Sequence, residues 1–180
     1  SFVFLAPGFE EIEALTPGDV MRRANIDVKT VAIDDSLVVE GAHGVGLKAD
    51  LYFSECDFAE ADWLILPGGL PGASNLAAFS PLTELLKFHH SKNGRIAAIC
   101  ASPGVVLGPL GILEGKRATA YPGFEGGMKG ATPVAERVVV DGNVITANGP
   151  SSAMAFALAI VEADRGKDTA HEVASGMLCD

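Results

Sequence analysis

The sequence is poor in cysteine, and its cysteines are widely separated. The three cysteines among its 180 residues are Cys56, Cys100 and Cys179. This number and spacing exclude a disulfide framework and a CxxC zinc site, and an odd count indicates free thiols. The four histidines are His43, His89, His90 and His171. They show no metal-ligand spacing with the cysteines, so we expect a protein without a bound metal.

Positive charge is also scarce. The chain has 13 lysines and arginines against 23 aspartates and glutamates, which gives a formal net charge of -10. Basic residues stand next to each other only at Arg22-Arg23 and Lys116-Arg117. Such a surface repels phosphate backbones, which argues against a nucleic-acid partner.

Long hydrophobic runs are missing, although hydrophobic residues make up 48% of the chain. No run approaches the roughly 20 residues that a membrane-spanning helix needs, so no membrane partner is expected. The first seven residues form one short strand-like run without the basic start of a signal peptide. These absences predict a soluble, cytoplasmic protein.

Apolar, β-branched runs alternate with helical patterns along the chain. Strands are predicted at 2–7, 27–33, 62–69 and 95–99, with shorter ones within 37–53 and a hairpin over 136–147 around Asp141-Gly142. Helices are predicted at about 10–24, at 80–94 (capped at its start and closed by Gly94), from 103 onward, and at 151–166 and 167–178. This alternation predicts a single α/β domain, residues 1–180, with a mostly parallel sheet covered on both faces.

Cys100 lies where the buried strand 95–99 gives way to a helical pattern. One interpretation is a buried thiol that serves as a small hydrophobic side chain. The other is a nucleophile elbow, in which a strand-to-helix turn presents the side chain at the edge of the sheet. The positive end of the following helix then favours the thiolate. Ala101 and Ser102 allow such a tight turn, and Pro103 suits the first turn of a helix.

Two other segments are expected at the same edge of the sheet. Gly68 and Gly69 suit a simple turn, but their free N–H groups also suit an anion pocket that faces the sulfur. Glu13 follows Glu10 by one helical turn, and its side chain can point inward. Beside a thiolate its carboxyl has to be protonated, because two adjacent anions raise the pKa of one of them. The protonated carboxyl would donate a hydrogen bond to the sulfur.

The remaining charged candidates suit ordinary structural roles. Glu10 and Glu11 place negative charge at the N-terminus of the first helix, where it is favourable. His43 lies in a glycine turn, and His89 and His90 lie at a helix end. We expect all three histidines to be solvated at the surface.

Anion-binding segments of the nucleotide type are absent. The chain has neither a GxGxxG nor a Walker sequence, so no nucleotide cofactor is expected. The segment "NGPSSA", which includes Gly149 and Pro150, precedes the helix 151–166. Its free amides suit an anion, and ordinary helix capping explains them equally well.

Long motifs of this sequence resemble those of the ThiJ/PfpI superfamily, in the branch of the Parkinson-associated protein deglycase and its bacterial relatives. They include "APGFEEIEALTPGDVMRRANI", "LILPGGLPGASNL", "AAICASPGVVLGPLGILEGK" and "DGNVITANGPSSAMAFALAIVEADRG". The resemblance implies a flavodoxin-like three-layer sandwich and a homodimer. It also places the family's reactive cysteine on Cys100, the acid that hydrogen-bonds its sulfur on Glu13, and the main-chain donors of the oxyanion pocket on Gly69 and Ala101.

One position departs from that branch. Its members usually carry histidine before proline in the segment after the cysteine helix, whereas "ATAYPGF" has Tyr121 there. Tyrosine is a poor base near neutral pH because its pKa is about 10. Cysteine hydrolases need a base within hydrogen-bond reach, and Ala101 stands where the protease branch has histidine. These differences argue against peptidase and glutaminase activity.

Two classes of function remain. In the first, Cys100 adds to a reactive dicarbonyl and Glu13 shuttles protons in a cofactor-free glyoxalase or deglycase reaction. In the second, the protein is a redox-regulated sensor or chaperone in which peroxide converts Cys100 to sulfinate. Tyr121 in place of histidine predicts a weak carbonyl reaction and favours the second class.

Overall fold

Seven strands form the central sheet in a computed structural model, which describes residues 1–179. Their order is β10-β11-β7-β6-β1-β2-β5; β10 runs antiparallel to β11, and all other neighbours are parallel. The strands are β1 (Phe2–Leu5), β2 (Lys29–Ala32), β5 (Leu51–Tyr52), β6 (Trp63–Leu66), β7 (Arg95–Ile99), β10 (Val138–Asp141) and β11 (Val144–Ala147). The predicted α/β fold with a mostly parallel sheet is confirmed.

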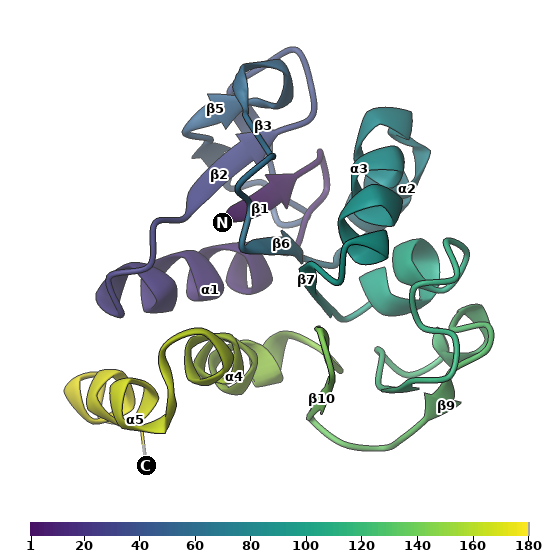
Figure 1. Cartoon of the computed structure of the whole chain (residues 1–180). Coiled ribbons are helices and arrows are strands. Elements are labelled where there is room, and N and C mark those ends of the chain that lie inside the picture. Colours follow the sequence, from purple (N-terminus) through teal and green to yellow (C-terminus); the bar gives the residue numbers. More distant parts are fainter. Residues whose placement is uncertain (180) are drawn as a thin grey trace.

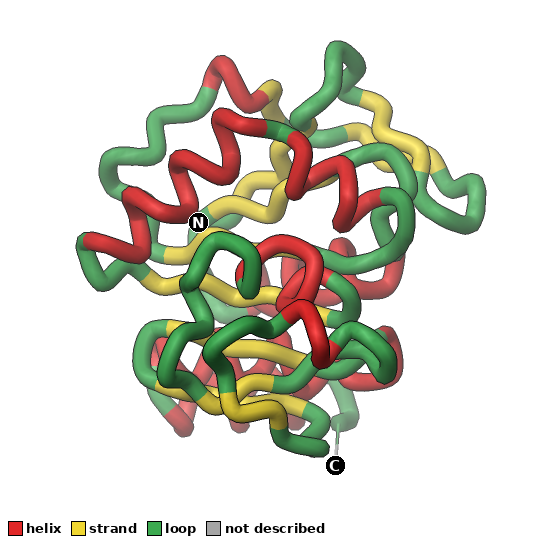
Figure 2. The backbone as a smooth tube through the Cα atoms, turned by 90° about the vertical axis from the view of Figure 1, so that its right-hand side faces the viewer, coloured by secondary structure: helices red, strands yellow, loops and turns green. Residues whose placement is uncertain are grey.

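Helices cover both faces of this sheet, so the molecule has three layers. Figure 1 shows α1, α4 and α5 together on one face and α2 and α3 on the other. Figure 2 shows the strands lying between helices. The α-helices are α1 (Glu11–Arg23), α2 (Gly72–Ala78), α3 (Ser80–Ser91), α4 (Ala153–Arg165) and α5 (Lys167–Gly176). Of the helices within residues 1–179, none has the length and apolar character needed to cross a bilayer.

The core has two halves, one on each side of the sheet. Successive side chains of a strand point to opposite faces, so Val3 and Leu5 of β1 join the cluster under α1 and α4, while Phe4 joins the cluster under α2 and α3. Both faces are dry, which explains why the central strands are continuous apolar runs and not alternating ones. Polar side chains and free backbone N–H groups therefore gather at the carboxyl ends of these strands, where the loops after β1, β6 and β7 begin.

A hairpin outside the main sheet lies against the start of α1. It pairs β3 (Val38–Glu40) with β4 (Gly46–Lys48) in antiparallel fashion. The Gly8 N–H donates to the Glu40 carbonyl, and the Ala42 N–H donates to the Phe9 carbonyl, each at 2.8 Å. These bonds dock the loop 41–45 onto the segment that joins β1 to α1. A second small sheet pairs β8 (Arg117–Ala118) with β9 (Thr132–Pro133).

The segment after Cys100 differs from its prediction. Instead of an α-helix, the chain forms a five-residue π-helix, η2 (Pro103–Leu107), followed by turns. A neighbouring loop crosses this segment at close range, since a Cβ on Gly108 would lie 2.0 Å from the Gly127 carbonyl oxygen. So short a helix contributes little positive potential at its N-terminus.

Two smaller predictions need correction, and one helix was missed. The predicted hairpin is present as β10 and β11, but its two-residue turn is Gly142-Asn143, because Asp141 still pairs within the ladder. The helix α3 has no side-chain hydrogen bond at its start, so the predicted cap there is wrong, whereas the Gly94 N–H donates to the His89 carbonyl and closes the other end. The helix α2 was not predicted, because seven mostly small residues carry too little periodicity.

The short helices lie in the loops. They are the 3-10 helices η1 (Phe53–Glu55), η3 (Glu125–Gly127) and η4 (Pro150–Ser152). The helix η3 lies between β8 and β9, whereas η4 follows β11 at the carboxyl ends of the strands, where open α/β sheets bind ligands.

Candidate functional site

Cys100 follows directly on the last residue of β7 and leaves the strand through a left-handed backbone conformation, with φ of 66°. This conformation is unfavourable for a residue with a Cβ, by about 1–2 kcal/mol. Two backbone hydrogen bonds hold it: the Cys100 N–H donates to Ala147, and the Cys100 carbonyl accepts from the Tyr121 N–H, each at 2.8 Å. The sharp turn after β7 agrees with the elbow interpretation, but the residue is only 9% exposed, so the turn does not present the side chain at the surface.

Glu13 turns inward from α1, as predicted, and is fully buried. Its Oε2 accepts a hydrogen bond of 2.8 Å from the Gly68 N–H. Burial raises the pKa of Glu13 to about 7, although the bonds from Gly68 and Cys100 act in the opposite direction. The carboxyl is therefore able to hold or release a proton near neutral pH, which is the property expected of a proton carrier.

The thiol of Cys100 strongly favours its protonated form. Burial, followed by the charge of Glu13, raises the pKa of Cys100 to about 12, while hydrogen bonds from the Gly69 and Ala101 amides lower it. The predicted donors are present, since the Gly69 and Ala101 amides favour the thiolate, but burial outweighs them and the short η2 adds little. A proton on Glu13 removes the repulsion between the two anions and so makes the thiolate less unfavourable, although burial still opposes it.

Gly68 and Gly69 bring the end of β6 against this pair, as predicted. A Cβ on Gly68 would lie 2.6 Å from the Cys100 Cβ and 2.7 Å from the Glu13 Oε2. Gly69 has a φ of 85°, and a Cβ there would lie 2.4 Å from the Glu10 nitrogen. Neither position has room for a side chain, so the two glycines let backbone amides approach the sulfur.

Tyr121 and Gly149 lie together beside the backbone of Cys100. The Tyr121 residue is 46% exposed, and a Cβ on Gly149 would lie 3.2 Å from its ring. No hydrogen bond within residues 1–179 joins the Tyr121 hydroxyl to Cys100 or Glu13. Pro150 opens η4 and has no N–H to offer an anion.

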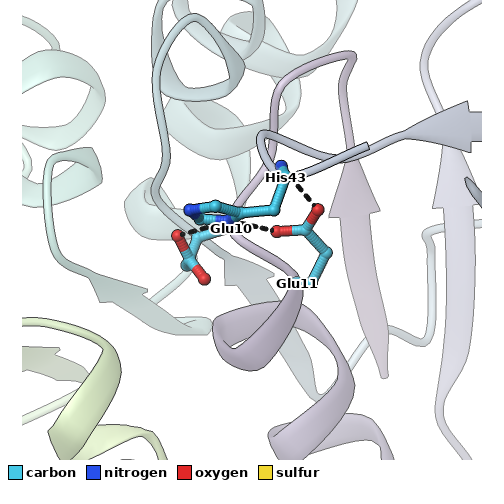
Figure 3. Close-up of side chains that lie close together, drawn as sticks. All are labelled: Glu10, Glu11 and His43. Atoms are coloured by element: carbon cyan, nitrogen blue, oxygen red, sulfur yellow. Dashed lines mark hydrogen bonds and ion pairs between the residues drawn. The ribbon is translucent and has the colours of Figure 1, made fainter. Parts of the chain in front are cut away.

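A cluster of Glu10, Glu11 and His43 lies next to this site, and sequence reasoning missed it. Figure 3 shows the His43 ring between the two carboxylates. Its Nδ1 lies 2.8 Å from the Glu11 Oε2 and 3.6 Å from the Glu10 Oε2. The Glu11 Oε1 accepts from the backbone N–H groups of His43 and Val45, at 2.8 and 3.4 Å. Glu11 therefore fixes the hairpin loop instead of merely placing charge at a helix start.

The ligand atoms of this cluster lie within 4.8 Å of one another, a spacing that metal sites also have. Both oxygens of Glu11 are already used by hydrogen bonds, so we interpret the group as a hydrogen-bonded ion pair. Its charges are mutually stabilising. Burial alone would raise the pKa of Glu11, but the hydrogen bonds from His43 and the backbone outweigh it and lower the pKa to about 2. Glu11 and Glu10 in turn raise the pKa of His43. The prediction of a metal-free protein stays a prediction.

Two of the other histidines also differ from their prediction. His89 and His90 are partly buried, and burial lowers the pKa of both. The His89 Nε2 lies 3.2 Å from the Arg95 carbonyl at the start of β7. His89 and His90 therefore pack at the end of α3 and are not freely solvated.

The other two cysteines have no comparable surroundings. The Cys56 thiol donates to the Tyr52 carbonyl at 3.3 Å, and burial and the charge of Glu55 raise its pKa. Cys179 is partly buried near the C-terminus. Among the three, only Cys100 lies within a group of amide and carboxyl donors.

Comparison with known proteins gives one consistent family. A family model described as DJ-1/PfpI matches residues 2–163. Protein DJ-1 homolog B of Arabidopsis thaliana is 39% identical over 174 residues, which cover 97% of this chain and 40% of the plant protein. The chain therefore spans less than half the length of the Arabidopsis relatives that it matches.

Two further relatives are similar over most of both chains. A Caenorhabditis elegans protein named glutathione-independent glyoxalase DJR-1.2 is 36% identical over 164 residues, which cover 88% of this chain and 84% of the nematode protein. The structure of oxidized Toxoplasma gondii DJ-1 has a TM-score of 0.95 and 38% identity, and the match covers 98% of this chain and 96% of that one.

Proposed function

Because the chain belongs to the DJ-1/PfpI family, we propose that it is a cysteine-dependent stress-protection protein whose reactive group is Cys100. The proposed substrates are small reactive carbonyls, converted without a cofactor in a weak glyoxalase or deglycase reaction. The name of the C. elegans relative supports the carbonyl part. Peroxide is the second proposed reactant, and it takes Cys100 to sulfinate. A reducing, cytoplasmic compartment suits the three free thiols.

The observation that carries this proposal is the pairing of Cys100 with Glu13. A buried thiol and a buried carboxyl, each with a raised pKa, lie together next to the Gly69 and Ala101 amides. Groups with strongly shifted pKa values concentrate at functional sites. A thiol that served only as a small hydrophobic side chain would need neither an inward-facing acid nor an unfavourable backbone conformation.

The carbonyl reaction uses these groups in order. The Cys100 sulfur forms a bond to the aldehyde carbon of a 2-oxoaldehyde, and the carbonyl oxygen gains the electron pair and the proton held by Glu13. Glu13 then moves a proton from this carbon to the neighbouring one through an enediol, which leaves a thioester. Water hydrolyses the thioester to a 2-hydroxy acid and restores the thiol. The Gly69 and Ala101 amides donate to the oxygen that becomes negative.

The second candidate function is a non-enzymatic redox-regulated sensor or chaperone. The exposed Tyr121 favours it, because no imidazole follows η2 to act as a base. The similarity to an oxidized DJ-1 structure supports it too. Both candidate functions use Cys100. They differ in whether the protein converts a carbonyl substrate catalytically or is only oxidised at this residue.

Turnover of methylglyoxal by the purified protein separates the two candidates. We expect a slow conversion to lactate that Cys100→Ser lowers at least a hundredfold, because the hydroxyl is a much weaker nucleophile than the thiolate. Tyr121→His is expected to raise the rate about tenfold, as a general acid–base group contributes more than this when well placed. Unchanged turnover in Cys100→Ser contradicts the enzymatic proposal. If neither the wild type nor Tyr121→His converts methylglyoxal, the result supports the second candidate, the redox-regulated sensor or chaperone.

We also propose a homodimer, formed through the exposed apolar face of α1. Ile12 and Leu15 are large, exposed and three residues apart, so they lie on the same face of α1. Val45, which is also exposed, lies beside them, because its N–H donates to Glu11. Light scattering is expected to give twice the mass of one chain. Ile12→Lys is expected to shift the protein to monomer, while Phe88→Lys, on the equally exposed Phe88 of α3, leaves the mass unchanged. A wild-type monomer contradicts the proposal.

A further inference from the structure

We infer that Glu10 and His43 determine the charge selectivity of the Cys100 site. The negative charge of Glu10 favours neutral carbonyls over anionic ones such as 2-oxo acids. His43 offsets this charge when its imidazole is protonated. The inference rests on the proposed function, because it names the class of carbonyl that the same thiol would accept. It concerns two residues whose arrangement sequence reasoning did not predict.

The backbone of Glu10 forms part of the wall of the thiol site. Its N–H donates to the Gly68 carbonyl at 3.0 Å, and its nitrogen lies 2.4 Å from where a Cβ of Gly69 would be. The Glu10 charge also helps to raise the pKa of Glu13, the acid of the reactive pair. Glu10 is thus an acid beside the site that takes no part in the proposed chemistry.

The charge of Glu10 is not neutralised by a permanent cation. Its side chain is 13% exposed, and its partner in an ion pair is His43, at 3.6 Å. The arginines of α1 are engaged elsewhere, Arg22 with Asp50 and Arg23 with Asp19. The charged groups that shift the pKa values of the reactive pair are Glu13 and Glu10, both acidic. An anion that approaches the sulfur therefore meets negative charge.

The protonation state of His43 changes this charge. The imidazolium and the two carboxylates sum to one negative charge, whereas the neutral imidazole leaves two. Glu11 holds Nδ1, and Glu11 and Glu10 raise the pKa of His43, so the imidazolium persists above the usual range of histidine. The His43 side chain is 68% exposed, so bulk solvent weakens the effect without removing it. The site should reject anions more strongly as pH rises.

Two alkylating reagents of similar size measure this directly. Iodoacetamide is neutral and iodoacetate is an anion, and both attack the Cys100 thiolate, so the ratio of their rates does not depend on how much thiolate is present. The rates are followed at the Cys100 peptide by mass spectrometry and normalised to glutathione. Glu10→Gln is expected to raise the iodoacetate/iodoacetamide ratio about three- to fivefold, the effect of one partly screened charge several ångströms away.

Two more variants complete the experiment. His43→Gln is expected to lower the ratio at pH 6, where it removes a positive charge, and to lower it less at pH 9, where less of the wild-type imidazole is protonated. Glu84→Gln, an exposed acid on α3 without an ion pair among residues 1–179, serves as the control and leaves the ratio unchanged at both pH values. Should Glu10→Gln fail to fold, the pH-dependent difference in His43→Gln decides the question by itself.

The result that overturns the inference is a ratio that moves in neither Glu10→Gln nor His43→Gln while circular dichroism shows native folds. A ratio that moves equally in Glu84→Gln also overturns it, because the effect would then come from the overall charge. Alkylation needs no turnover. Absence of methylglyoxal conversion therefore counts against the proposed enzymatic function, and the alkylation ratio still tests the charge selectivity.

Discussion

Replacing Gly68 with alanine is expected to remove at least 99% of the reactivity of Cys100 and to destabilise the protein by about 1–3 kcal/mol. The added Cβ would lie 2.6 Å from the Cys100 Cβ, 2.7 Å from the Glu13 Oε2 and 3.0 Å from the Ile99 carbonyl oxygen. All three atoms are held by the backbone or by burial, so the thiol and the carboxyl must separate. Alkylation rates at Cys100 and the midpoint of urea unfolding measure the two effects.

Gly126→Ala is the matched control. A Cβ added at Gly126 would have no neighbouring atom within 4 Å, and the backbone there is one that other residues adopt. Thiol reactivity and stability should therefore stay close to wild type. Wild-type thiol reactivity in Gly68→Ala would contradict the close contact between β6 and Cys100. That outcome would remove the geometric basis of the proposed site.

Mild peroxide is expected to add two oxygen atoms to Cys100 before it modifies Cys56 or Cys179. The first peroxide converts the thiolate to sulfenate with release of water, and the second converts sulfenate to sulfinate. The proton held by Glu13 permits the thiolate, and the Gly69 and Ala101 amides can donate to the new oxygens. Burial and Glu55 disfavour the thiolate of Cys56. Peptide-resolved mass spectrometry over a peroxide series measures the order.

Two variants of Glu13 separate its roles in this oxidation. Glu13→Leu removes the donor and leaves the buried Gly68 N–H without its acceptor, so oxidation at Cys100 should slow at least tenfold or stop at another product. Glu13→Gln keeps an acceptor for Gly68 and a donor for sulfur but cannot hold the mobile proton. It should slow the first step while still stabilising sulfinate. First oxidation at Cys56 or Cys179, or wild-type behaviour of Glu13→Leu, contradicts this account.

The sequence was sufficient for the layers of the fold and for placing Cys100 and Glu13 at the candidate site. The alternation of apolar runs with helical periods predicts a parallel sheet covered on both faces, because each period reports which face of its own element is buried. The position of Cys100 at the end of one run and of Glu13 one helical turn after Glu10 places both at the same edge of that sheet. These inferences need only local spacing and the rule that parallel strands end together.

Only the tertiary structure decided how these groups behave. The pKa of Cys100 depends on burial beneath segments far away in the sequence, and the predicted helix after it is only the five-residue η2. His43 contacts Glu11 across 32 positions of the chain, so no local pattern could distinguish it from a solvated surface histidine. The sequence by itself determined which side chains reach the edge of the sheet. Their charges and proton affinities depend on desolvation and on distant neighbours, and these exist only once the chain has folded.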